Sequence, residues 1–112
     1  MYLYEMEVVL GNLETDISQF KKLIYDCHNI YNRSSALSRN KKNISSLTIT
    51  KNNTIQLTLT SEVKLKQPLK GLHLFSTLLI KNATDEEKEN ILYGKRTVLR
   101  LLSCTETEIK EG

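Results

Sequence analysis

The sequence has few glycines, few cysteines, few aromatic residues and no tryptophan. Its four glycines form no G-x-x-x-x-G-K-[ST], G-x-G-x-x-G or G-x-S-x-G pattern, so neither a phosphate-binding loop nor a nucleophile elbow is indicated. No stretch approaches about 18 consecutive apolar residues, the length that predicts a transmembrane helix. The amino terminus carries Glu5 and Glu7 where a secretory signal carries Lys or Arg. We therefore expect a cytoplasmic protein without a membrane partner.

The two cysteines, Cys27 and Cys104, lie far apart and outside any C-x-x-C spacing, so the common zinc and redox motifs are missing. A metal site built on His28 and His73 would need a third ligand, and no residue is spaced to supply it. We expect no metal, no other cofactor and two buried free thiols. Spacing alone leaves a disulfide open, although disulfides are rare inside cells.

Groups suited to catalysis are equally scarce. His28 follows Cys27 directly, and adjacent positions on a helix point about 100° apart, so the two side chains cannot form a nucleophile and base pair. His73 lies in an apolar run, where a half-buried structural histidine is the ordinary outcome. The acids of "DEEKE" fit the first turn of a helix, where carboxylates stabilise the helix dipole. The sequence therefore predicts a protein that is not an enzyme.

The length and composition fit one small domain. A chain of 112 residues is too short for two cores of ordinary size. Hydrophobic residues make up 39%, and Ile, Leu and Val recur along most of the chain, so a core can form without metal or disulfide support. We predict a single domain over residues 1–112, with a basic loop near residues 32–43 and a polar tail near residues 105–112.

Apolar periodicity at the amino terminus predicts a strand and then a long helix. Residues 2–10 alternate in the manner of a half-buried strand. Asp16 followed by Gln19 resembles a capping box, and Thr15 is the alternative cap. The helix should end in the region 32–40, where Asn and Ser are frequent. Spacings of three and four give this helix one apolar stripe, made of Ile17, Phe20, Ile24, Cys27 and Tyr31.

In the middle of the chain the period changes to two. Two alternating runs flank Asn52 and Asn53, and because Asn tolerates a positive φ, this pattern predicts a hairpin turn. The second run keeps its phase to Leu65, which makes a strand long enough that it should bend near Ser61. Pro68 should end it.

The last third of the chain is less clearly patterned. Residues 72–80 are almost continuously apolar, which favours a buried strand, with a buried helix as the alternative. Thr84 with Glu87 forms a capping box at the start of a short helix, and Gly94 supplies its stop. The chain should close with a strand, although a helix continuing to Leu102 is the alternative.

These elements predict an α+β fold. We expect a curled antiparallel or mixed sheet of about five strands, with partial closure into a small barrel as an option, covered by one long helix and accompanied by one short helix. Small barrels that bind single-stranded nucleic acid share this architecture, although the likeness is one of architecture alone.

The net charge of +3 conceals an uneven distribution. Residues 1–26 carry two basic and five acidic side chains, residues 27–70 carry eight and one, and residues 71–112 carry six and seven. A basic region attracts nucleic acid or acidic protein surfaces. Two tyrosines lie near these basic side chains in the sequence. Their rings could stack on unpaired nucleotide bases, which favours RNA or single strands over duplex DNA. The candidate nucleic-acid-binding residues are Tyr31, Arg33, Arg39, Lys41, Lys42, Tyr93, Lys95, Arg96 and Arg100.

The leading hypothesis is a small non-enzymatic regulatory protein of a bacterium, phage or plasmid that binds nucleic acid, RNA above all, through this basic face. The alternative is a protein-interaction module: a homodimer formed through residues 72–80 or through an edge strand, or an antagonist that docks on an acidic protein. A contiguous basic stripe beside Tyr31 or Tyr93 would favour nucleic acid. Scattered bases beside an exposed apolar patch would favour a protein partner.

Overall fold

The computed structural model describes residues 1–11, 16–35, 42–93, 96–97 and 99–110. Short 3-10 helices are labelled η. The elements are β1 (Tyr2–Leu10), η1 (Ile17–Phe20), α1 (Lys21–Ser35), β2 (Asn43–Ile49), β3 (Ile55–Ser61), η2 (Pro68–Leu72), α2 (His73–Asn82), α3 (Asp85–Ile91), β4 (Leu92–Tyr93), β5 (Arg96–Thr97) and β6 (Leu99–Glu108). No helix in this described part combines the length and the apolar character needed to cross a membrane.

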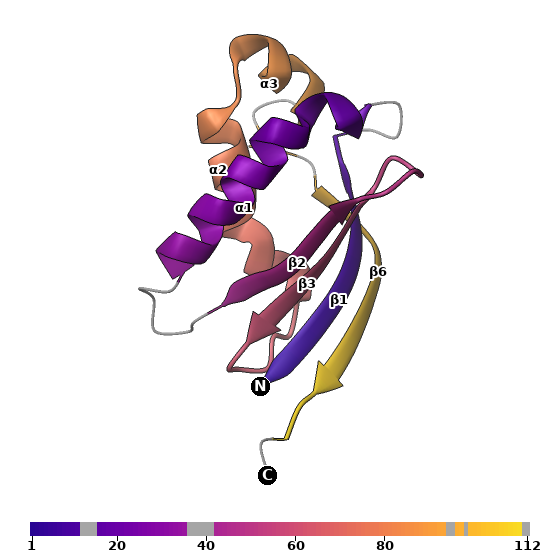
Figure 1. The fold of residues 1–112 in the computed structure, drawn as a ribbon, viewed down its shortest axis with the longest axis vertical. Coiled ribbons are helices and arrows are strands. Elements are labelled where there is room, and N and C mark those ends of the chain that lie inside the picture. Colours follow the sequence, from indigo (N-terminus) through magenta and orange to yellow (C-terminus); the bar gives the residue numbers. More distant parts are fainter. Residues whose placement is uncertain (12–15, 36–41, 94–95, 98, 111–112) are drawn as a thin grey trace.

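The fold is a two-layer α+β arrangement. An open, fully antiparallel sheet has the strand order β2-β3-β1-β6, and the helices cover one of its faces (Figure 1). The α+β class and the antiparallel sheet are confirmed. The prediction of about five strands, one long helix and one short helix is matched only in part. In the described residues the main sheet has four strands and is open rather than closed into a barrel, β4 and β5 pair separately, and there are three α-helices.

The predicted first strand and long helix are confirmed. Tyr4, Met6 and Val8 face the core, and every member of the predicted apolar stripe on the helix is buried. The first turn of that stripe is the 3-10 helix η1, which runs directly into α1. The side chain of Asp16 caps η1 by accepting a hydrogen bond from the amide of Ser18 at 3.1 Å.

The hairpin between β2 and β3 is also confirmed. Asn53 has φ 64°, the left-handed conformation expected at a tight turn. The hydroxyl groups of Thr50 and Thr54 are hydrogen-bonded at 2.6 Å across the base of the turn. The amide of Ile17 donates to Oδ1 of Asn53 at 2.7 Å, so the hairpin tip is tied to the start of η1.

The bend predicted near Ser61 is confirmed, but the strand does not continue beyond it to Leu65. β3 ends at Ser61, whose hydroxyl donates to the carbonyl of Val63 at 2.8 Å and accepts from the amide of Val63 at 3.2 Å. These local bonds turn the chain out of the sheet. Beyond the turn, the amide of Leu65 donates to Oη of Tyr4 at 2.6 Å, and Pro68 opens η2.

The favoured strand over residues 72–80 was also wrong, and its helical alternative is correct. α2 buries Phe75 and Leu79, four residues apart, and leaves Leu74 exposed, which is the pattern of a helix packed on one side. Phe75 contacts Tyr31 of α1 edge to face, with ring centroids 6.4 Å apart. His73 starts α2 and is exposed, so the half-buried histidine expected there is absent.

The short helix α3 and the closing strand β6 agree with the prediction, except that β6 extends further than predicted. The predicted capping box of α3 is confirmed, because Thr84 Oγ1 accepts from the amide of Glu87 at 3.1 Å and Glu87 Oε1 accepts from the amide of Thr84 at 2.9 Å. The closing strand is confirmed as β6. The polar tail predicted from residue 105 begins later, because β6 pairs with β1 as far as Glu108, opposite Tyr2.

Candidate functional site

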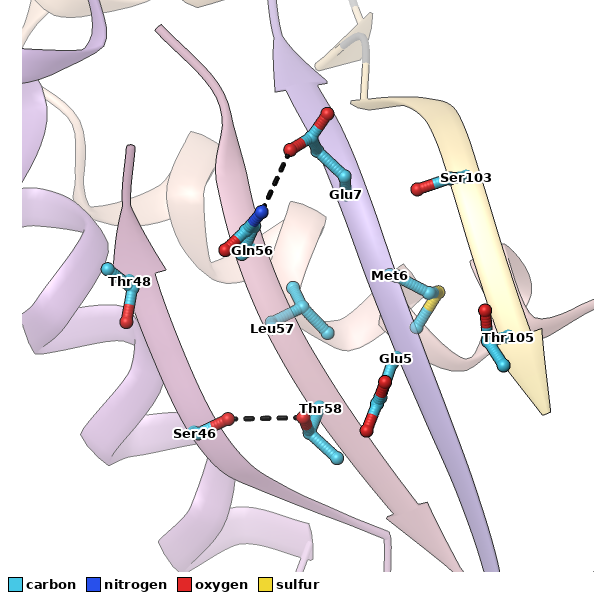
Figure 2. A pocket seen from close by; sticks show the side chains of 10 residues that line it. All are labelled: Glu5, Met6, Glu7, Ser46, Thr48, Gln56, Leu57, Thr58, Ser103 and Thr105. Atoms are coloured by element: carbon cyan, nitrogen blue, oxygen red, sulfur yellow. Dashed lines mark hydrogen bonds between the residues drawn. The ribbon is translucent and has the colours of Figure 1, made fainter. Parts of the chain in front are cut away.

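The face of the sheet opposite the helices is polar and slightly hollow. Figure 2 shows Glu5 and Glu7 of β1 standing among the side chains of the three other strands. Nε2 of Gln56 donates to Glu7 Oε2 at 3.1 Å, and Ser46 Oγ donates to Thr58 Oγ1 at 3.1 Å (Figure 2). The residues that line this hollow include two carboxylates and no basic side chain. Phosphate is therefore repelled from this hollow.

Tyr31 is not available as a stacking platform. Its side chain is 1% exposed, and its hydroxyl donates to the carbonyl of Gly71 at 3.0 Å. Removal from water raises the pKa of Tyr31 to about 12. In this structure the ring belongs to the contact between α1, η2 and α2, so it offers no exposed face to a nucleic-acid base.

Three basic residues of the predicted site lie at two ends of the sheet. Arg33 lies in the last turn of α1 and Lys42 precedes β2, whereas Arg100 is the second residue of β6 and pairs with Val9. Asn43, the residue after Lys42, is aligned through β3 with Leu3. Leu3 and Val9 are six residues apart on β1, which corresponds to about 20 Å along a strand. Arg100 therefore does not join Arg33 and Lys42 in one stripe.

The remaining predicted site residues lie either outside the described residues or in the small ribbon of β4 and β5. Arg39, Lys41 and Lys95 lie outside the described residues. Tyr93 lies in β4 and Arg96 in β5, the two strands of the separate ribbon. Binding of RNA or single-stranded nucleic acid therefore stays a prediction made from the sequence.

At Ile44, side chains of α1 cover the β2 edge of the main sheet. Oδ1 of Asn32 accepts from the amide of Ile44 at 2.9 Å, and Nδ2 of Asn32 donates to the carbonyl of Ile44 at 3.0 Å. Nε2 of His28 lies 2.7 Å from the same carbonyl, and because a carbonyl only accepts, this nitrogen carries the ring proton. The two side chains thus take the place of a neighbouring strand at Ile44.

The opposite edge, β6, has a strand on one side only. It pairs with β1, and no further strand of the described chain lies beyond it (Figure 1). β6 is ten residues long, and every residue after Leu99 is exposed. Leu101 is 39% exposed and Leu102 is 52% exposed. An edge strand of this length with exposed leucines is the usual template for pairing with another chain.

The hydrogen-bond alternation indicates which backbone groups of β6 face outward. The amide of Ile109 donates to the carbonyl of Met1 at 2.8 Å, and the amino terminus of Met1 donates to the carbonyl of Ile109 at 3.3 Å. Hydrogen-bonded pairs alternate with non-hydrogen-bonded pairs along an antiparallel ladder. Counting back from Ile109, the peptide groups of Glu108, Glu106 and Cys104 point away from β1 and toward the free edge.

The two cysteines differ in exposure. Cys27 is fully buried in the core, as predicted, and desolvation with help from the nearby carboxylates of Asp26 and Glu87 raises its pKa to about 11. Cys104 is exposed on β6, so the prediction of two buried thiols was half wrong. Partial burial and then the carboxylate of Glu106 raise the pKa of Cys104. Both cysteines are free thiols.

β6 also carries a bulge. Glu7 pairs with Ser103 and Val8 pairs with Leu101, so Leu102 is an extra residue in the strand. A bulge of this kind places two residues opposite one and strengthens the local twist. Leu101 and Leu102 therefore share the position opposite Val8, and together they form the exposed apolar part of the edge.

Comparison of the chain with protein-family models, with curated proteins and with solved structures found no match. Within the described residues, no three His, Cys, Asp or Glu side chains gather closely enough to hold a metal ion. The sequence reasoning named an edge strand as one route to a dimer but could not say which strand would form the edge. The alternation in "LLSCTETE" indicates a strand, but alternation alone does not distinguish an edge strand from an internal one.

Proposed function

We propose that the protein is a non-enzymatic interaction module that binds a protein partner through the free edge of β6. The partner contributes one extended segment, which adds to the sheet as a fifth strand. In such β-strand addition, main-chain hydrogen bonds supply affinity and alternate side chains supply specificity. A regulatory protein can work in this way by occupying a strand edge that its target would otherwise use.

The difference between the two sheet edges carries this proposal. Asn32 and His28 satisfy the outer peptide group of β2 at Ile44. On β6 the outward peptide groups of Cys104, Glu106 and Glu108 lie in an exposed strand. Natural sheets usually protect such edges with charges, prolines, bulges or covering helices. β6 has a bulge and two glutamates, yet it keeps the exposed leucines of the bulge.

Affinity capture with the tagged full chain from its source cells tests the proposal. Leu102→Lys places a charge on the β6 edge, and Leu74→Lys is the matched control, because Leu74 is an exposed leucine of α2. We expect a protein that is retained by the wild type and by Leu74→Lys and lost from Leu102→Lys. In the recovered complex, amide hydrogen exchange should slow in residues 102–108.

Equal capture by both variants would contradict the proposal, because binding would then not depend on the β6 edge. Loss of capture only in Leu74→Lys would also contradict it and would direct attention to α2. Circular dichroism of each variant checks that the fold is retained, and a surface Lys at an edge strand should change stability little.

A further inference from the structure

We infer that the segment added at the β6 edge carries two basic side chains, two positions apart, that face Glu106 and Glu108. This inference rests on the proposed function and names the chemistry of its partner. The segment is an extended part of another protein, and it runs antiparallel to β6 along residues 104–108. A neutral or acidic segment can meet the same peptide groups but lacks this charge pairing.

The backbone of β6 determines which partner residues face the two glutamates. The peptide groups of Cys104, Glu106 and Glu108 point toward the free edge, in the alternation that begins at Ile109. In an antiparallel ladder, such a residue exchanges two hydrogen bonds with the partner residue directly opposite, and the two Cα atoms lie about 5.5 Å apart. Directly opposite residues also place their side chains on the same face of the sheet. The partner residues opposite Glu106 and Glu108 therefore lie beside these carboxylates.

The two faces of β6 differ in charge over this stretch. Glu106 lies opposite Tyr4, whose buried side chain marks the helix-facing side, and Glu108 lies two residues further along the same side. Thr105 and Thr107 stand on the other side and are neutral. Opposite charges in facing positions stabilise a strand pair, and so do paired threonines. The complementary segment therefore has bases at alternate positions and Thr or another neutral residue between them.

A buried hydroxyl holds Glu106 in place. Tyr4 Oη donates to Glu106 Oε1 at 3.0 Å and accepts from the amide of Leu65 at 2.6 Å. The Tyr4 side chain is 0% exposed, so its hydroxyl is a fixed donor. A carboxylate that is already held loses less side-chain entropy when it forms an ion pair. Because this bond uses Oε1, Oε2 is the oxygen of Glu106 that a partner's base reaches.

The same glutamates disfavour other occupants of the edge. Charged side chains that point inward on an edge strand are a common protection against pairing with neutral strands. A second copy that pairs over residues 104–108 sets Glu106 opposite Glu106, and like charges in facing positions destabilise a strand pair. Discrimination between partners arises from such repulsion as well as from attraction. Glu106 and Glu108 thus select a basic segment.

The bulge limits the length of the paired segment. Leu102 interrupts the regular ladder, so regular pairing extends over residues 104–108, which span about 17 Å. Leu101 and Leu102 are exposed beyond this stretch. The end of the segment that reaches them is expected to be apolar, because contact with it removes these leucines from water.

Nuclear magnetic resonance titration of the isotopically labelled full chain tests the pairing with two synthetic peptides of identical composition. The alternating peptide, acetyl-Arg-Thr-Arg-Thr-Val-Leu-Leu-amide, presents both bases on one face. The control peptide, acetyl-Arg-Arg-Thr-Thr-Val-Leu-Leu-amide, has adjacent bases, which face opposite sides of a strand in every register. We expect the alternating peptide to shift the amide signals of residues 104–108, and the control peptide to bind about threefold more weakly.

Glutamine variants assign the effect to the two carboxylates. Glu106→Gln and Glu108→Gln should each raise the Kd of the alternating peptide about threefold, and the combined variant should raise it about tenfold and bind the two peptides equally. Gln retains an oxygen acceptor for the Tyr4 hydroxyl, so the fold is kept. Glu5→Gln is the matched control, because it removes a carboxylate from the opposite face, and it should leave the Kd unchanged.

Three results would overturn the inference. The first is equal binding of the two peptides to the wild type, or no shift at residues 104–108. The second is a loss of affinity in Glu5→Gln as large as in the combined variant, which would place the bases on the open face. The third is a set of signals at residues 104–108 that shift with the concentration of the chain itself, which would identify a second copy as the occupant.

Affinity capture separates this inference from the function on which it rests. A partner that is lost from Leu102→Lys but retained by the combined variant of Glu106→Gln and Glu108→Gln overturns the basic segment and keeps the β6 edge as the binding site. Capture that depends on neither change overturns both. Capture that both changes reduce supports both.

Discussion

Tyr31 shows that a tyrosine near basic residues in the sequence can be a core residue rather than an exposed stacking surface. A tyrosine beside several bases reads as a stacking platform for RNA, but this ring lies in the core and its hydroxyl is paired with Gly71. The helical spacing of Phe20, Ile24, Cys27 and Tyr31 already indicated burial. Periodicity proved the stronger signal, since it reflects the packing of the whole helix rather than the neighbours of one residue.

Cys27 makes the stability depend on pH in the alkaline range. Its pKa of about 11 in the folded chain exceeds the ordinary value of 9.0, so the unfolded chain loses this proton first. The stabilisation is fully present below pH 9 and is lost as the pH rises through about 11, with a slope of up to about 1.4 kcal/mol per pH unit. In urea unfolding between pH 8 and 11, the stability gap between the wild type and Cys27→Ala should therefore narrow. If the free energies of unfolding of the wild type and of Cys27→Ala changed equally with pH, the Cys27 thiol would not be desolvated.

At the scale of elements, α1 has two functions in the fold. One side buries the apolar stripe against the sheet, and its last turns present His28 and Asn32 to the β2 edge. A side-chain amide supplies one donor and one acceptor, which is what a peptide group of an edge strand requires. The helix therefore satisfies the outer peptide group of β2 at Ile44.

Asn32→Ala should lower the free energy of unfolding by about 1–3 kcal/mol, because it leaves the buried amide of Ile44 without its acceptor. Asn29→Ala is the matched control: Asn29 is exposed one turn earlier, and the gain in helix propensity is the same. Urea unfolding of both variants gives the difference. Equal stability of the two variants would mean that water replaces Asn32 at the edge without cost.

At the scale of the molecule, acidic, basic and apolar side chains are exposed on different parts of the sheet. The open sheet face carries Glu5 and Glu7 among hydroxyl and amide groups (Figure 2). The described bases of the predicted site are divided between the β2 end and the β6 end of the sheet. The apolar exposure at Leu101 and Leu102 lies on the remaining free edge. By the criterion set from the sequence, scattered bases beside an apolar patch favour a protein partner.

We expect titration of unstructured RNA at two salt concentrations to give no binding tighter than about 100 μM at low salt, the strength of weak non-specific binding. The physical reason is the separation of Arg100 from Arg33 and Lys42. Fluorescence anisotropy measures the affinity. Tighter binding that weakens uniformly in the triple variant Arg39→Ala, Lys41→Ala and Lys42→Ala, with a flatter salt slope, would contradict this expectation and restore the RNA hypothesis.

The sequence alone determined the local elements. Alternation identified β1, three-four spacing identified the stripe of α1, Asn53 marked the hairpin turn, and Thr84 with Glu87 marked the start of α3. These features depend on residues close together in the chain, where backbone propensity and capping act. The short apolar segment at residues 72–80 was the exception, because a buried helix and a buried strand have the same composition.

Only the tertiary structure decided which strand became an edge and which side chains stayed exposed. β1 pairs with both β3 and β6, Met1 is hydrogen-bonded to Ile109, and α1 satisfies the β2 edge at Ile44. Strand order follows from how the sheet and helices share one core, a property of distant segments that no local pattern encodes. The fold therefore identifies β6 as the free edge at which a partner could bind, and the sequence alone does not identify it.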